Sequence, residues 1–314
     1  MNAVFTPRCV LLSCALSLFA CSKKPSEGEA PKPGAGASAK PAAPVASGLP
    51  GASSAVSKVV NPGNLPAYSG PTGTVTGVVS ASGDQAPVAT EHLNRITGAC
   101  PEARESYGKA FREGMMRSLA DVLVAVTGYD GYVPEKQPKQ IIAARGCAYN
   151  TRTIALTFGQ TIEVVSKDSE TYVPNLLGSK MAAQLFALPG GAGSTLYPPQ
   201  VGHYVLTDDL KVFMMADVFV LAYSTHAVTG LDGRYEISGI PAGKARVSAL
   251  LPATGAVLEK DVVIEPGKAL EVAFELPFDA KAFAEKNAAA VASAAAAGST
   301  KAPRAAAAPS ASAH

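Results

Sequence analysis

The sequence has little net charge and few histidines, and it lacks the familiar catalytic motifs. Its formal net charge at pH 7 is +2, which is too small to indicate a nucleic-acid partner. The four histidines, His92, His203, His226 and His314, form no H-E-x-x-H or H-x-x-E-H pattern and no local cluster with cysteine. No G-x-S-x-G or G-x-x-x-x-G-K-[ST] pattern occurs either. We therefore expect neither an enzyme nor a resident cofactor.

The N-terminal residues have the layout of an export signal. Arg8 precedes an apolar run at 9–20, which is shorter than the roughly 20 residues that span a bilayer. The run ends in Leu18-Phe19-Ala20-Cys21, which resembles the lipobox of bacterial lipoproteins. The resemblance implies that 1–20 is a signal peptide, that cleavage occurs before Cys21 and that its thiol carries lipid. Ser22 after the cysteine favours the outer membrane, so we expect a lipid-anchored protein of the cell envelope.

Low-complexity segments flank the central part of the sequence. Residues 21–68 are rich in Pro, Ala, Gly, Ser and Lys and have few large apolar side chains. Such a stretch buries too little surface to offset its chain entropy, which predicts a disordered linker. Residues 279–314 are Ala-rich, which allows a transient helix, but no apolar stripe would dock it. We predict a disordered tail there.

Cysteine usage points to one covalent cross-link. Of the five cysteines, Cys9 and Cys14 would leave with the signal, and Cys21 would be lipidated. Cys100 and Cys147 remain, in a compartment that is oxidising if the chain is exported. A disulfide between them is the expected state. The alternatives are a free pair or a metal pair, although neither cysteine has a Cys or His partner nearby in the sequence.

Between the tails, short β-branched segments separated by Gly and Pro predict a mainly β fold of one or two sandwiches. The residues Gly73 to Ser80 alternate in polarity, as expected for a half-buried strand. Further strands are predicted at 120–126, 153–158, 161–165, 212–215, 218–223, 234–237, 245–250, 261–264 and 270–274. The range Glu91 to Ser118 is the one predicted helical segment.

The segment 228–243 contains two turn signals. Asp232-Gly233 and Pro241-Ala242-Gly243 bracket the strand-like Arg234-Tyr235-Glu236-Ile237, and glycine supplies the positive φ of such turns. This arrangement resembles carboxypeptidase-regulatory-like (prealbumin-like) domains, whose first strand is matched by Gly73-x-Val75-x-Gly77-x-Val79. The resemblance implies that 69–133 and 224–278 form one β-sandwich, in which 73–79 pairs with strands after His226.

A second resemblance covers the residues in between. Gly146-Cys147-Ala148-Tyr149, Gly159-Gln160 and Ser166-Lys167-Asp168 resemble in order and spacing the motifs of a cupredoxin-like family. The resemblance implies that 134–223 is a cupredoxin-like β-sandwich, inserted into the prealbumin-like unit or packed on it.

Copper-binding members of that family need two imidazoles and a thiolate with a weak axial ligand. Counting from the motifs places these ligand positions at Tyr172, Asp208, Lys211 and Met214. Only the axial methionine is kept, and no Cys or His lies between Val205 and Thr225. We therefore predict that the copper site is lost and that no metal is bound.

These expectations combine into one functional hypothesis and two alternatives. The leading hypothesis is a membrane-anchored envelope lipoprotein that acts as a non-enzymatic binding or structural module, with an envelope protein or a glycan as its partner. One alternative is a copper-binding or electron-transfer cupredoxin whose ligands lie elsewhere. The other is carbohydrate or peptidoglycan binding through sandwich loops, which contain Tyr129, Tyr132, Tyr149, Tyr172, Tyr197 and Tyr204.

Overall fold

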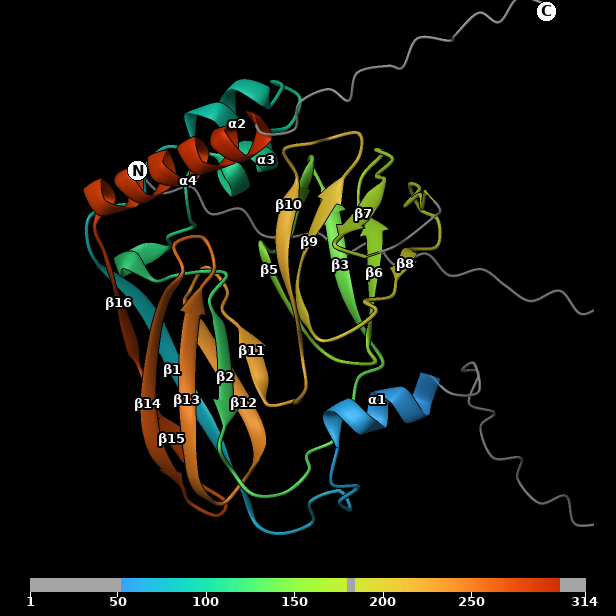
Figure 1. Cartoon of the computed structure of the whole chain (residues 1–314), viewed down its shortest axis with the longest axis vertical. Coiled ribbons are helices and arrows are strands. Elements are labelled where there is room, and N and C mark those ends of the chain that lie inside the picture. Colours follow the sequence, from blue (N-terminus) through green and yellow to red (C-terminus); the bar gives the residue numbers. More distant parts are fainter. Residues whose placement is uncertain (1–51, 180–183, 300–314) are drawn as a thin grey trace, which may run out of the picture. The chain divides into compact units, whose positions relative to one another are not determined.

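The computed structural model describes residues 52–179 and 184–299, which are mainly β (Figure 1). The predicted signal peptide, Cys21, most of the predicted linker and His314 lie outside the described residues. Among the helices that are described, none has the length and apolar character needed to cross a membrane.

Two four-stranded sheets form what we call the first sandwich. Strand β1 (Thr72–Gly83) is central in one sheet, where it pairs with β12 (Arg234–Pro241), β15 (Ala269–Glu271) and β16 (Phe274–Phe278). The other sheet has the order β11-β2-β13-β14, with bounds His226–Val228, Leu123–Thr127, Gly243–Leu251 and Ala256–Ile264. The predicted pairing of 73–79 with strands after His226 is confirmed for the antiparallel β1–β12 pair.

The core of the first sandwich lies between its two sheets. Alternate residues of β1, including Val75 and Val79, are fully buried and cluster with Val124 and Val247 from the opposite sheet. Gly77 has no room for a side chain, because a Cβ there would overlap the Val272 carbonyl. The alternation of polar and apolar residues expected for β1 is therefore the one that places its apolar residues in the core.

A second pair of four-stranded sheets, the second sandwich, is built from the strands between residues 139 and 221. One sheet has the order β4-β3-β6-β8, with bounds Ala148–Tyr149, Lys139–Arg145, Thr161–Ser166 and Ser194–Leu196. The other has the order β5-β10-β9-β7, with bounds Thr153–Thr157, Met215–Leu221, Gly202–Asp208 and Pro174–Leu177. Both sheets contribute to one core, which includes Leu156, Val164, Leu206 and Val218.

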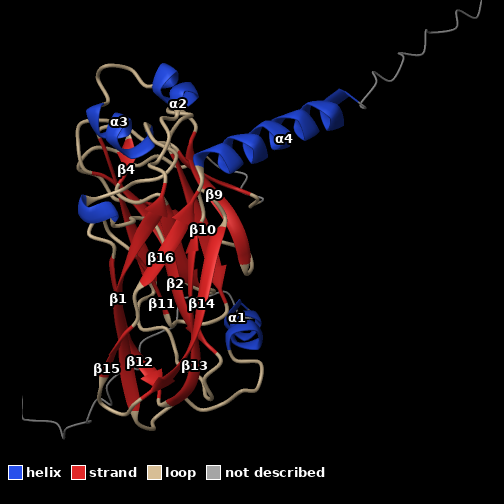
Figure 2. Ribbon diagram, turned by 90° about the vertical axis from the view of Figure 1, so that its left-hand side faces the viewer, coloured by secondary structure: helices blue, strands red, loops and turns tan. Residues whose placement is uncertain are grey.

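The single helical segment predicted for 91–118 is wrong. The structure has two short helices, α2 (Thr90–Arg95) and α3 (Pro101–Tyr107), and a 3-10 turn, η1 (Met115–Arg117); α2 and α3 lie together at one end of the strands (Figure 2). Pro101 begins α3, since proline suits only the first turn of a helix. The strand predicted at 212–215 is also wrong, because its first residues form a turn that Met214 closes with the Lys211 carbonyl, N···O 2.7 Å.

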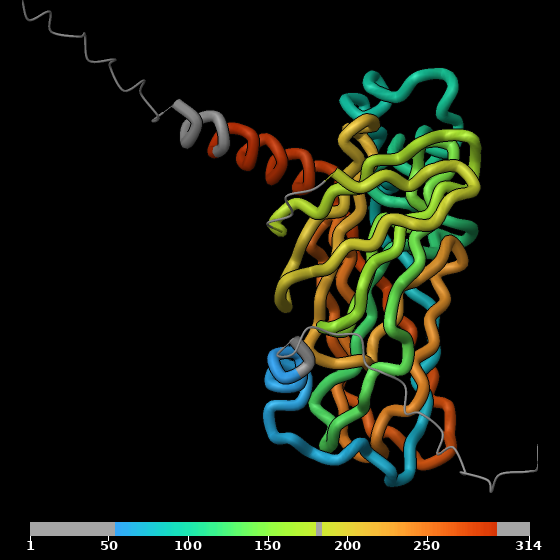
Figure 3. Tube along the Cα trace, turned by 90° about the vertical axis from the view of Figure 1, so that its right-hand side faces the viewer, coloured from blue at the N-terminus to red at the C-terminus, as the bar shows by residue number. Residues whose placement is uncertain are grey.

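Two helices lie at the inner ends of the segments that were predicted to be disordered. Helix α1 (Ala52–Val60), blue in Figure 3, lies within the predicted linker. Its Val56 side chain packs over Gly159 of the second sandwich. Helix α4 (Ala280–Ser299) docks through Phe283, whose ring centroid lies 5.5 Å from that of Phe278. A few apolar anchors therefore replace the continuous apolar stripe that we expected docking to require.

Candidate functional site

The four residues at the predicted copper-ligand positions lie together at the end of β9. The Lys211 ammonium nitrogen is 4.6 Å from the centroid of the Tyr172 ring. The Lys211 backbone N–H donates to Asp208 Oδ1 over 2.8 Å, and Met214 N donates to the Lys211 carbonyl over 2.7 Å. Asp208 and Met214 are buried. Positions chosen by counting along the sequence are thus brought into one cluster, which we call the Tyr172–Lys211 cluster.

Both oxygens of the Asp208 carboxylate are used by backbone N–H groups. Oδ1 accepts from Leu210 and Lys211 at 3.0 and 2.8 Å, and Oδ2 accepts from Val173 at 2.7 Å. Asp208 therefore closes the turn after β9 and ties it to Val173, the residue directly before β7.

The hydroxyl of Tyr172 connects this cluster to the disulfide. It donates to Asp168 Oδ2 over 2.7 Å and accepts from the backbone N–H of Cys147 over 3.3 Å. Burial and the hydrogen bond to Asp168 raise the pKa of Tyr172. Burial would raise the pKa of Asp168, but the hydrogen bonds from Tyr172 and from backbone N–H groups lower it overall. The predicted Cys100–Cys147 disulfide is confirmed, with Cα atoms 5.3 Å apart.

The chemistry of these donors does not fit copper. A type-1 site needs neutral imidazoles and a thiolate, whereas Lys211 presents an ammonium group that donates to the Thr171 carbonyl over 3.1 Å. The Asp208 carboxylate and the Tyr172 hydroxyl are both engaged in the hydrogen bonds described above. Among the described residues, no group of three or more His, Cys, Asp or Glu side chains has the geometry of a metal site.

A groove of about 600 Å³ lies between the two sandwiches. We call it the inter-sandwich groove; it is lined by residues of β3, β5 and β11 and by Arg112 and Glu135. Two of its lining residues, Glu135 and His226, contact Thr157: Thr157 Oγ1 is 2.8 Å from Glu135 Oε2 and 3.2 Å from His226 Nε2. Because an ionised carboxylate only accepts, the Thr157 hydroxyl donates to Glu135, and His226 donates from Nε2.

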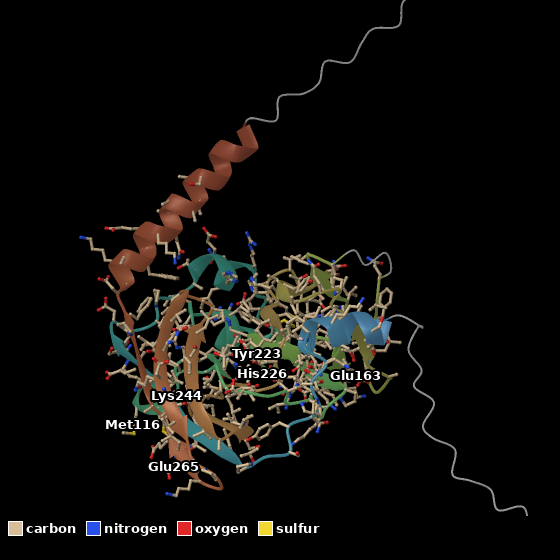
Figure 4. All side chains as sticks on the ribbon, turned by 60° about the horizontal axis from the view of Figure 1, so that its bottom comes forward. Met116, Glu163, Tyr223, His226, Lys244 and Glu265 are labelled. Carbon is tan, nitrogen blue, oxygen red and sulfur yellow. A yellow bond between two sulfur atoms is a disulfide. The ribbon has the colours of Figure 1, made fainter. Side chains whose placement is uncertain are left out.

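The pKa of His226 lies below its ordinary value in this arrangement. Burial lowers its pKa, and the nearby Glu135 carboxylate only partly offsets the effect. Tyr223 and His226 lie close together (Figure 4), and Thr157 Oγ1 is also 3.3 Å from the Tyr223 carbonyl. Thr157 is 4% exposed, so its hydroxyl joins strands of the two sandwiches from a buried position.

Arg112, which also lines the groove, forms a buried ion pair with Asp121 that the sequence did not reveal. Asp121 Oδ2 accepts from Arg112 Nε over 2.6 Å, and Oδ1 accepts from Arg112 Nη2 over 2.5 Å. Asp121 Oδ1 also accepts from Thr151 Oγ1 and from the backbone N–H of Arg152, at 3.1 and 2.8 Å. These contacts link the loop before β2 to the start of β5. The sequence offered one sign of it, because Asp121 is an acidic residue within the otherwise apolar segment that was predicted to be a strand.

The remaining histidines and tyrosines do not gather into one site. His203 pairs with Asp217, Nε2···Oδ1 2.7 Å, on the outer face of β9 and β10. Of the tyrosines considered for glycan binding, Tyr149, Tyr172 and Tyr204 are buried in the second sandwich, whereas Tyr197 is exposed. The tyrosines thus do not form a shared aromatic platform in the described part of the chain.

Comparisons with known proteins find only distant structural likeness. No protein-family model and no curated protein matches the sequence. A reduced mutant of amicyanin matches 27% of this chain and 85% of its own length, with 16% identity and a TM-score of 0.24. Amicyanin from Paracoccus versutus matches 26% of this chain and 79% of its own length, with 14% identity and a TM-score of 0.23.

Proposed function

We propose that the protein is a lipid-anchored module of the bacterial cell envelope that binds or organises a partner without catalysis. The observation that carries this proposal is the Tyr172–Lys211 cluster. At the positions where a copper-binding relative would place its ligands, the polar side chains of this chain are already engaged: the Lys211 ammonium lies over the Tyr172 ring, the Tyr172 hydroxyl donates to Asp168, and the Asp208 carboxylate accepts from backbone N–H groups. The second sandwich keeps a packed core there, so its role is to present surface rather than to hold a metal.

Export and anchoring are supported by separate observations. The apolar run at 9–20 is followed by Cys21 in a lipobox-like sequence, and the Cys100–Cys147 disulfide suits an oxidising compartment. Among the described residues, every buried side-chain nitrogen and oxygen has a hydrogen-bond partner. Such internal saturation is typical of a structural core rather than of a reactive site.

Copper loading tests the proposal. The full chain, purified in detergent, is incubated with a copper(II) salt and dialysed, and bound copper is measured together with the visible absorption spectrum. We expect neither stoichiometric copper nor the blue colour of thiolate-bound copper. The triple variant Tyr172→His, Asp208→Cys, Lys211→His keeps Met214 and supplies the ligand types of a type-1 site, so it is the positive control. A blue wild-type protein would overturn the proposal.

Anchoring has its own test. Cells that express the chain are fed an alkyne fatty acid, and the label on the protein and its distribution between membrane and soluble fractions are measured. We expect label and membrane association for the wild type and for the matched control Cys14→Ser, and no label for Cys21→Ser. Label that persists in Cys21→Ser would refute the proposed anchor.

A further inference from the structure

Three strands that line the inter-sandwich groove have an edge that their sheets leave wholly or partly uncovered. Strand β5 is the edge of its sheet in the second sandwich, and β11 is an edge of the first sandwich. Strand β3 is covered on its outer side from Ala143 to Arg145, where Asn150 and the two-residue strand β4 bond to it. The backbone groups on these edges can be assigned from the strand register and from the hydrogen bonds that flank each ladder.

On β3, the even-numbered residues bond to β6. Thr161 N donates to the Pro138 carbonyl over 3.2 Å, and Lys167 N donates to the Ala144 carbonyl over 2.9 Å, which fixes the parallel alternation. The odd-numbered residues therefore point to the other edge. Ala143 bonds there with Asn150 through both its N–H and its carbonyl. Ile141 points the same way and is 56% exposed, and its N–H and carbonyl have no hydrogen-bond partner in the described part of the chain.

On β5, the same alternation leaves one residue open. Asp217 N donates to the Arg152 carbonyl and Phe158 N donates to the Leu221 carbonyl, both over 2.8 Å, so the even-numbered residues bond to β10. Thr153 and Thr157 face away and are satisfied locally, by Thr151 and by Gln160.

Ala155 lies between those two threonines and also faces away from β10. Its backbone N–H and carbonyl have no partner among the described residues, although the residue is only 7% exposed. Ala155 therefore adds one backbone donor and one acceptor to the groove that it lines.

On β11, the odd-numbered residues bond to β2. Val126 N donates to the Thr225 carbonyl over 2.9 Å, and Thr229 N donates to the Val122 carbonyl over 3.0 Å. Val228 therefore turns its N–H and carbonyl away from β2. Ile141, Ala155 and Val228 all line the inter-sandwich groove, so open backbone donors and acceptors from three strands converge on one cavity.

We propose that the inter-sandwich groove binds an extended segment of another polypeptide, which adds as a strand to the open edge of β3. The open backbone groups match the alternating donors and acceptors of an extended chain. The exposed Ile141 side chain and the neighbouring Ala227 and Val228 favour small or β-branched side chains in the ligand. The inference rests on the proposed binding role and names the class of partner.

The sequence of β3 is typical of a strand edge that pairs with few partners. Lys139 is paired with Glu163, and Arg145 contacts Glu102 with N···O 3.4 Å. Charged residues at both ends discourage indiscriminate pairing of sheet edges, while Ile141 leaves the centre apolar. The edge is therefore protected at its ends and open at its middle, where the groove gives access.

Peptide selection on the full chain in detergent tests the proposal. A phage-displayed random dodecapeptide library is panned on the immobilised protein, and the selected peptide is labelled with fluorescein for anisotropy measurements. Ile141→Pro removes the open N–H without touching the bonds to β6. The matched control Ile141→Ala removes the side chain and keeps the N–H. We expect Ile141→Pro to weaken binding at least about tenfold and Ile141→Ala less than about threefold.

Amide hydrogen exchange gives a second readout that does not depend on a variant. Adding the selected peptide to the wild type should slow exchange at Ile141 and leave Gln140, which bonds to β6, unchanged. A library that yields no specific binder would overturn the inference, as would a peptide that Ile141→Pro binds with unchanged affinity. These results are independent of copper loading and of lipid labelling, so a failure here is distinguishable from a failure of the proposed function.

Discussion

The buried ion pair between Arg112 and Asp121 should be the most sensitive polar contact in the protein. Asp121 is 5% exposed, and the Arg112 side chain is 14% exposed. Replacing Asp121 by Asn keeps the shape of the side chain and also suits the backbone, because Asp121 has φ +64° and asparagine tolerates the left-handed region. The Asp121→Asn substitution therefore removes the charge and one hydrogen-bond acceptor, and the backbone conformation at residue 121 can be kept.

The expected loss is about 3 kcal/mol, since removing one partner of a buried pair leaves the other charge uncompensated. The assay is equilibrium unfolding of the full chain in urea, followed by circular dichroism because the sequence has no tryptophan. Arg112→Leu should cost a similar amount. The double variant should lose less than the sum, with a coupling energy of about 1–3 kcal/mol.

A loss below about 1 kcal/mol for Asp121→Asn would refute this reasoning, because a surface pair has that magnitude. A double variant whose loss in free energy of unfolding equals the sum of the two single losses would refute the reasoning as well. The reference variant is Asp261→Asn, which breaks an ion pair with Arg246 on the exposed face of β13 and β14. We expect that change to be nearly neutral.

Three further outcomes are expected. Replacing both Cys100 and Cys147 by Ser should lower the free energy of unfolding by about 4 kcal/mol, because the loop entropy of the unfolded chain is released; urea denaturation measures the difference, and an unchanged midpoint would contradict it. Phe283→Ala should undock α4, so limited trypsin digestion should cleave at Lys286 faster than in the wild type. The pKa of His226 is lowered by burial, so stability should fall as the pH drops below about 6.5, where the unfolded chain binds a proton that the folded chain resists. His226→Gln should lack this part of the pH dependence in denaturation curves from pH 5 to 7.5.

The mainly β fold could be predicted from the sequence because strand alternation is a local property. Val75, Gly77 and Val79 carry that pattern in β1, and the turn at Asp232-Gly233 marks the start of β12. Helices were predicted less well. The residues 91–118 have helical composition, but Pro101 and the cross-linked Cys100 divide the segment.

The sites depended on tertiary structure to different degrees. The Tyr172–Lys211 cluster could be located by counting from motifs, although its contacts could not. The inter-sandwich groove could not be predicted at all, because an open strand edge is defined by which neighbours are missing. The ion pair between Arg112 and Asp121 likewise depends on the tertiary contact between the loop before β2 and the start of β5. No local sequence pattern predicts that contact.

The position of the second sandwich within the chain has a consequence for the order of folding. All its strands lie between residues 139 and 221, so its pairings close as soon as that stretch is available. Strand β1, in contrast, must wait for β12, because Thr72 pairs with Pro241. Loop closure over such a separation is slow. In refolding experiments we therefore expect the second sandwich to acquire amide protection first. Protection of β1 should come later, when β12 pairs with it.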